Sequence, residues 1–381
     1  MITSSKSLAS VALLASSVFV LGACAAEAEP VEEAAAPAAT EEVEAAPALS
    51  GTLVGAGASS QGAAAEAWIA GFQTENPEVT VSYDPIGSGG GRETFQSGAS
   101  SFAGSDRAFK VDEIAEDNFG SCEPGTGIWE IPAYISPIAI IFNLEGIDTL
   151  NLDPDTLAGI FTGEITNWSD DAITSQNPGV DLPDLTITAV HRSDESGTTD
   201  NFTDYMAKAA PDTWLLNGEN AGNFEAWPAE WGGEGAPQTS GVVDAVTNGT
   251  GTIGYADASR AGDLGTVAVK VGAEYVPYSA EAAAKIVDAS PADSPGERGE
   301  TDLAIALDRA TDASGTYPIV LVSYFIGCND YKDDSVVDLM KAYASYVISE
   351  EGQAAAQANA GNAPISADLR AKAEAVIAAI Q

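Results

Sequence analysis

The sequence predicts an α/β fold with two lobes and with sheets covered by helices. Val79, Val81 and Tyr83 alternate as in a strand, whereas residues 64–72 place their apolar side chains at helical spacing. Segments of these two kinds alternate along the chain, which is typical of sheets with helices on their faces. The 381 residues indicate two lobes, because a domain commonly holds about 100–200 residues.

The first 50 residues are predicted to lie outside the folded part. Lys6 precedes a short apolar stretch, residues 11–21, which matches an export signal and is too short to span a membrane. The signal ends in Leu-Gly-Ala-Cys, which resembles a bacterial lipobox, so residues 1–24 are expected to be a lipoprotein signal peptide lipidated at Cys24. An ordinary signal cut near Ala23 or Ala26 is the alternative. Residues 25–50 are rich in Ala, Glu and Pro and predict a flexible acidic tether.

The folded part is expected to begin near Gly51. The predicted strands are residues 52–54, 79–83, the segment ending at 102–106, 185–190 and 318–327. The predicted helices are the segment stopped before Pro77, residues 157–161, a face from Phe202 to Ala209, and residues near 335–350 and 367–380. Residues 240–257 predict a helix, a turn and a strand. Residues 128–143 are apolar but contain two prolines, which suggests a segment crossing between lobes rather than one strand.

The charge balance limits the class of partner. Fifteen Lys and Arg against 57 Asp and Glu give a net charge of −42. Such a surface repels nucleic acid and anionic lipid. An anionic ligand would therefore need donors gathered locally.

Three segments combine a strand end, small Ser and Gly residues and a helix start: residues 57–60, 87–91 and 196–198. The first N–H groups of a helix have no partner within it, and the helix dipole favours an anion there. One such segment alone would be explained by helix capping. Three in one α/β chain favour an anion site at the carboxyl ends of the strands.

Two charged residues refine this prediction. Arg192 can grip a tetrahedral oxyanion with two parallel hydrogen bonds, and Asp194 is placed to orient its guanidinium. An ordinary surface Arg–Asp pair is the alternative. Asp106 only accepts hydrogen bonds when ionised, so it favours a ligand that brings its own proton, such as hydrogen phosphate, and rejects sulfate.

The motifs GAGASS, IGSGGG, FAGSDRAF, ITNWSDDAI, RSDESGTTDNF and GTIGYAD occur in the order seen in periplasmic phosphate-binding proteins of ABC importers, which the chain resembles. The likeness is good from residue 51 to about 260 and looser beyond. It implies a two-lobed type II periplasmic-binding-protein fold, each lobe a helix-covered mixed sheet, with the ligand in the cleft. The chain would cross between lobes near residues 134–142 and 312–322. Lobe I would comprise residues 51–136 and 322–381, and lobe II residues 137–321.

The resemblance also implies the ligand contacts. They are Ser59, Ser60, Ser88, Asp106, Arg192, Ser196, Gly197 and Thr198, with Asp194 orienting Arg192. The chain departs from the family at two places. Thr-Phe is usual where Ser59-Ser60 stand, and a glycine is usual where Glu195 stands, so the Glu195 carboxylate must point outward or weaken binding. Arg92 has no assigned role and is a possible helper.

The resemblance implies high-affinity capture of inorganic phosphate outside the cytoplasmic membrane and delivery to the permease of an ABC importer. The protein is expected to be a monomer, held at the membrane only by its lipid. The alternatives are another oxyanion, such as sulfate, molybdate or an organic phosphate, or a tethered surface scaffold.

Catalysis is not expected. The only histidine, His191, stands five residues before Ser196, and the chain has no Gly-x-Ser-x-Gly nucleophile motif, no ATP-binding loop and no metal-ligand spacing. No cofactor is expected. Cys122 and Cys328 are predicted to form a disulfide, since an exported protein meets an oxidising compartment. Two buried free thiols are the alternative.

Overall fold

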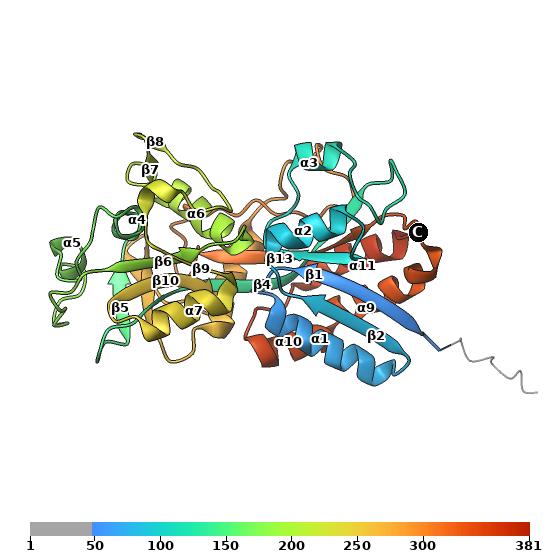
Figure 1. Cartoon of the computed structure of the whole chain (residues 1–381), viewed down its shortest axis with the longest axis horizontal. Coiled ribbons are helices and arrows are strands. Elements are labelled where there is room, and N and C mark those ends of the chain that lie inside the picture. Colours follow the sequence, from blue (N-terminus) through green and yellow to red (C-terminus); the bar gives the residue numbers. More distant parts are fainter. Residues whose placement is uncertain (1–47) are drawn as a thin grey trace, which may run out of the picture. The chain divides into compact units, whose positions relative to one another are not determined.

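Two long antiparallel strands, β4 (Ile128–Phe142) and β13 (Val320–Cys328), organise the fold in the computed structural model, which describes residues 48–381. Every residue of both strands is buried. Residues 128–137 of β4 pair with β13, and residues 138–142 pair with β10 (Thr252–Asp257). One strand therefore runs through both halves of the sheet, as Figure 1 shows.

The first half of the sheet contains the N-terminal strands. Its order is β2-β1-β3-β13-β4, with β1 parallel to β2 and β3 and with β13 antiparallel to β3. The strands are β1 (Gly51–Gly57), β2 (Val79–Asp84) and β3 (Phe102–Ser105). Its helices are α1 (Gly62–Glu75), α2 (Ser88–Gln96), α3 (Val111–Ala115), α9 (Val337–Ile348), α10 (Glu350–Ala360) and α11 (Ala367–Ala379).

The second half continues from β4 through β10 and β6 (Thr188–Arg192) to β9 (Glu234–Ala236). Its other strands are β5 (Thr149–Leu152), β11 (Gly265–Val271) and β12 (Glu274–Val276), and β7 (Leu215–Leu216) pairs with β8 (Glu219–Asn220). Its helices are α4 (Pro154–Thr162), α5 (Asp171–Thr174), α6 (Gly197–Ala209), α7 (Gln238–Asn248) and α8 (Ala280–Ala289). Three short 3-10 turns are η1 (Ala229–Trp231), η2 (Ala258–Arg260) and η3 (Asp334–Val336).

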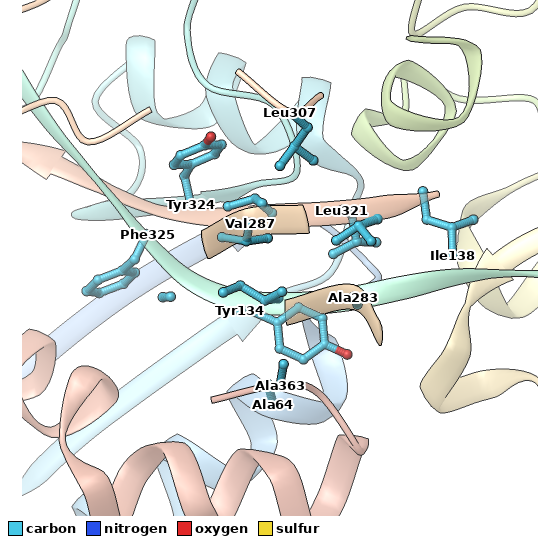
Figure 2. Packing of buried hydrophobic residues seen from close by; sticks show 14 of the residues in the cluster. Ala64, Tyr134, Ile138, Ala283, Val287, Leu307, Leu321, Tyr324, Phe325 and Ala363 are labelled. Carbon is cyan, nitrogen blue, oxygen red and sulfur yellow. The ribbon is translucent and has the colours of Figure 1, made fainter. Parts of the chain in front are cut away.

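The core follows the two long strands. Figure 2 shows Tyr134 and Ile138 of β4 with Leu321 and Phe325 of β13, among the buried side chains. Phe325 also lies 4.9 Å from Phe102 of β3, measured between ring centroids. The two strands are mostly apolar, as expected for strands covered on both faces.

The α/β fold with helix-covered mixed sheets is confirmed, but β4 differs from its prediction. The segment does run through both halves of the sheet, yet it is one strand despite Pro132 and Pro137. Pro132 faces a register shift between Ser323 and Tyr324, where the ladder is already irregular. A proline is tolerated in a strand at such an irregularity because no regular ladder bond is lost there. Helix α10 was not predicted, since its Ala- and Gln-rich sequence has only a weak apolar face.

The predicted disulfide is present and joins Cys122 to Cys328 across 206 residues of sequence. It ties the segment after α3 to the end of β13. The predicted lipid attachment at Cys24, the signal peptide and most of the tether lie outside the described residues. None of the helices in residues 48–381 is long and apolar enough to cross a membrane. The lobe boundaries at residues 136–137 and 321–322 stay a prediction.

Candidate functional site

Each of the three predicted strand-to-helix junctions is present. Ser59 and Ser60 lie in the turn between β1 and α1, Ser88 is the first residue of α2, and Ser196 is the N-cap of α6. The strands that precede these helices are β1, β2 and β6, and all three end toward the middle of the sheet, where β4 and β13 run (Figure 1). The helix starts can therefore face one another.

Asp106 connects these helix starts. It follows β3, and only 3% of its surface is exposed. Ser60 Oγ lies 2.7 Å from each of its carboxylate oxygens, and Thr198 Oγ1 donates to Oδ2 at 2.9 Å. The Asp106 N–H donates to Ser88 Oγ at 3.1 Å. One residue thus contacts the starts of α1, α2 and α6.

Gly197 allows α6 to approach this closely. A Cβ atom at Gly197 would lie 2.6 Å from Ser88 Oγ and 2.9 Å from Asp106 Cβ, closer than real Cβ atoms come. A glycine at this first position of α6 is therefore required for the contact between α2 and α6.

Arg192 ends β6 and is 3% exposed, so its pair with Asp194 is not an ordinary surface ion pair. Its Nε donates to Asp194 Oδ1 at 2.8 Å and its Nη2 to Oδ2 at 2.5 Å. The Gln238 N–H donates to Asp194 Oδ1 at 2.9 Å. This fork-to-fork geometry fixes the plane of the guanidinium, and Nη1 has no acceptor among residues 48–381.

The electrostatics of the two carboxylates differ. Burial raises the pKa of Asp106, while hydroxyls of Ser60, Ser323 and Thr198 and the charge of Arg192 act against that rise. Burial also acts to raise the pKa of Asp194, but the hydrogen bonds and charge of Arg192 outweigh it and keep the pKa below its usual value. Asp194 is therefore ionised at neutral pH, whereas Asp106 retains a proton more readily than an exposed aspartate.

Ser59 and Ser196 use their hydroxyls within the protein. Ser59 Oγ lies 3.0 Å from Thr239 Oγ1 and accepts from the Thr239 N–H at 3.2 Å, which links α1 to α7. Ser196 Oγ accepts from the Thr199 N–H at 3.1 Å as the cap of α6. Seven of the eight predicted contact residues are buried and Ser59 is partly buried. Their contact with a ligand stays a prediction.

Three residues of this site were not predicted from the sequence. Tyr255 Oη lies 2.7 Å from Thr199 Oγ1 and accepts from the Arg192 N–H at 3.3 Å. Asn201 Nδ2 donates to the carbonyls of Asp106 and Gly197. Thr239, next to Ser59, follows Pro237 at the start of α7. For Thr239, the Pro-x-Thr pattern at a helix start could have indicated a residue of the site. Tyr255 and Asn201 carry no such pattern and look like ordinary strand and helix residues.

The sequence left the roles of two residues open. The Glu195 side chain is exposed, yet it lies beside the start of α2, where a Cβ atom on Gly89 would come within 2.8 Å of Glu195 Oε2. That its carboxylate points away from a ligand stays a prediction. Arg92 donates to Ser105 Oγ and to Glu225 Oε2 rather than to the eight predicted residues.

His191 is not paired with Ser196. Its ring stacks on Trp227 with centroids 4.9 Å apart, and its Nδ1 lies 2.9 Å from the carbonyl oxygen of Arg192. Burial lowers the pKa of His191. In residues 48–381 no group of three or more His, Cys, Asp or Glu side chains is arranged to hold a metal ion.

Comparison with known proteins decides the family. A model described as the PBP superfamily domain matches residues 42–351. A phosphate-binding protein PstS 3 of Mycobacterium tuberculosis is 32% identical over 336 residues, which cover 86% of each chain, and one from Mycobacterium leprae is 34% identical over 301 residues. The chain belongs to the PstS family.

Solved structures agree on the fold. A phosphate-bound, high-affinity periplasmic phosphate-binding protein, PfluDING, superimposes on 85% of this chain and 93% of its own with a TM-score of 0.67 at 21% identity. A phosphate-binding protein from Stenotrophomonas maltophilia gives a TM-score of 0.62 at 20% identity. This PstS-family member therefore has the periplasmic-binding-protein fold that its sequence predicted.

Proposed function

We propose that this chain captures inorganic phosphate outside the cytoplasmic membrane and delivers it to the permease of an ABC importer. The relatives that it matches over most of their length are named phosphate-binding proteins. The observation that carries the proposal is the meeting of three helix starts, one buried arginine and one buried carboxylate.

Each part has a role with phosphate. The N–H groups at the starts of α1, α2 and α6 donate to ligand oxygens. The chain's net charge of −42 repels an anion, so the site needs a local positive charge. Arg192 supplies it, and Asp194 fixes the plane of its guanidinium. The ionised Asp106 carboxylate accepts a hydrogen bond from the protonated oxygen of hydrogen phosphate and repels sulfate, which has no proton to donate.

The remaining features follow from this role. Ligand bonds from both halves of the sheet favour the closed arrangement, since only that arrangement makes all of them. The halves would be the two lobes, residues 51–136 with 322–381 and residues 137–321. The protein would be a non-enzymatic monomer, exported and anchored through a lipid on Cys24.

Isothermal titration of the exported chain tests the proposal. Phosphate should saturate one site per chain, and sulfate should give no heat at the same concentrations. Arg192→Met should weaken phosphate binding by about 100-fold, since charged hydrogen bonds contribute about 1.5–3 kcal/mol each. Arg370→Met is the control because Arg370 pairs with Glu350, which is 89% exposed.

The proposal would be abandoned if wild-type protein bound no phosphate. Tighter binding of sulfate than phosphate would replace it with the other-oxyanion alternative. Equal losses in the Arg192 and Arg370 variants would remove Arg192 from the site.

A further inference from the structure

Arg92 lies one turn beyond Ser88 in α2, and its two side-chain hydrogen bonds go to Ser105 and Glu225 rather than to a predicted ligand residue. The side chain is 5% exposed. Its Nη1 donates to Ser105 Oγ at 2.7 Å and its Nη2 donates to Glu225 Oε2 at 2.6 Å. Arg107 Nε donates to the same Glu225 oxygen at 3.0 Å. One carboxylate oxygen therefore accepts from two guanidinium groups.

This three-residue cluster, Arg92, Arg107 and Glu225, joins two sides of the site. Arg92 and Arg107 belong to α2 and to the loop after β3, the elements that present Ser88 and Asp106. Glu225 belongs to the loop between β8 and η1, and its carbonyl accepts from the Ser196 N–H at 3.2 Å. Figure 1 shows α2 and α6 in different halves of the sheet. The cluster thus links the halves without using any predicted ligand residue.

The cluster is buried enough for charge to matter. Arg107 is 9% exposed and Glu225 is 14% exposed. Burial acts to raise the pKa of Glu225, but Arg92 and Arg107 outweigh it and keep the pKa below its usual value. Removing the Glu225 carboxylate would remove the attraction between its loop in the second half and the two arginines of the first half, which favours separation of the halves.

We propose that Glu225, held by Arg92 and Arg107, is a positioning residue that raises phosphate affinity by favouring the closed arrangement of the two halves. The inference rests on the proposed phosphate function. Apparent affinity depends on the fraction of molecules in the binding-competent state, so a contact made only on closure increases affinity without touching the ligand.

Glu113 provides a matched control. Its carboxylate bonds to Arg107 Nη1 and Nη2 at 2.8 and 3.0 Å, but Glu113 lies in α3, on the same side as Arg107. Glu113→Gln removes a partner of the same arginine without removing a link between the halves.

The experiment measures phosphate affinity by calorimetry and phosphate release by stopped-flow for wild type, Glu225→Gln and Glu113→Gln. Small-angle scattering is recorded with and without phosphate. Glu225→Gln should weaken affinity about tenfold, mainly through faster release, and should expand the phosphate-free protein. Glu113→Gln should stay within about twofold of wild type, as expected when no bond between the halves is lost.

A double-mutant cycle with Arg92→Gln isolates the pair. The affinity losses of Arg92→Gln and Glu225→Gln should not add in the double variant, because both remove the same interaction. If circular dichroism shows that Glu225→Gln does not fold, Arg92→Gln is judged alone and should show about threefold weaker binding, since Arg107 still holds Glu225.

Unchanged affinity and release in folded Glu225→Gln would overturn the inference, as would an equal loss in Glu113→Gln. If wild type binds no phosphate, the proposed function and the effect on affinity both fail, and scattering then tests only whether Glu225 links the two halves. Expansion of Glu225→Gln but not of Glu113→Gln would then support the link, and equal scattering would refute it.

Discussion

Asp106 and Glu225 are two buried carboxylates that the protein holds in opposite ways. Asp106 accepts from the hydroxyls of Ser60 and Thr198, with Arg192 acting only through its field. Glu225 accepts directly from two guanidinium groups. The pKa of Asp106 is raised and that of Glu225 is lowered. Neutral donors thus leave the pKa of a buried carboxylate above its usual value, whereas cationic donors bring it below that value.

Replacing Glu225 or Asp106 by the corresponding amide tests this comparison through the free energy of unfolding. Glu225→Gln should lower the free energy of unfolding at pH 7 by about 2–3 kcal/mol, because two partly buried guanidinium groups lose their counter-charge. Urea denaturation of both proteins measures the loss.

The loss should depend on pH. A carboxyl whose folded pKa is lowered stabilises the fold above its ordinary pKa of about 4.3, and that contribution disappears as the pH falls through the folded value. The difference between wild type and Glu225→Gln should therefore shrink toward pH 3. A difference that stayed constant from pH 7 to pH 3 would show that charge is not its cause.

Much of the site could be anticipated from the sequence because it is built from local patterns. A strand end followed by Ser and Gly before a helix start marks Ser59, Ser88 and Ser196, and an Arg-x-Asp spacing marks the pair of Arg192 and Asp194. Each pattern is short and is determined by backbone geometry. The overall alternation of strands and helices has the same local origin.

The contacts between distant segments could not be anticipated in this way. Arg92 and Glu225 are separated by 133 residues and Ser59 and Thr239 by 180. The pairing of a given arginine with a given glutamate depends on the order of β6, β10 and β4 in the sheet. No local sequence pattern determines that order. The single strand β4 was misjudged for a related reason, since the register shift opposite Pro132 is a property of β13 as its partner.

Asp257 extends the comparison to a second carboxylate held by hydroxyls. It is fully buried at the end of β10, and its Oδ1 accepts from Tyr134 Oη at 3.0 Å and from the Ser259 N–H at 2.9 Å. Burial raises the pKa of Asp257 to about 6. A raised folded pKa stabilises the fold below the ordinary value near 3.9, and this contribution is lost as the pH rises through about 6.

Wild type should accordingly gain about 2 kcal/mol of stability, relative to Asp257→Asn, when the pH is lowered from 7 to 4.5. Urea denaturation of both proteins at the two pH values gives the difference, and other titrating groups cancel because the variants share them. A wild type that gained nothing over Asp257→Asn would mean that Asp257 titrates as an exposed aspartate.

Asp106→Asn should give the smallest change in stability, and its sign should be opposite to that of Glu225→Gln. The amide removes a charge whose burial is only partly offset by hydroxyl donors, so the free energy of unfolding at pH 7 should rise by about 1 kcal/mol. The same variant should weaken phosphate binding and admit sulfate, because the amide can donate to an oxygen that carries no proton. Stability and sulfate affinity that both stayed at wild-type values would show that Asp106 is neutral in the folded protein at pH 7 and does not select the ligand by its proton.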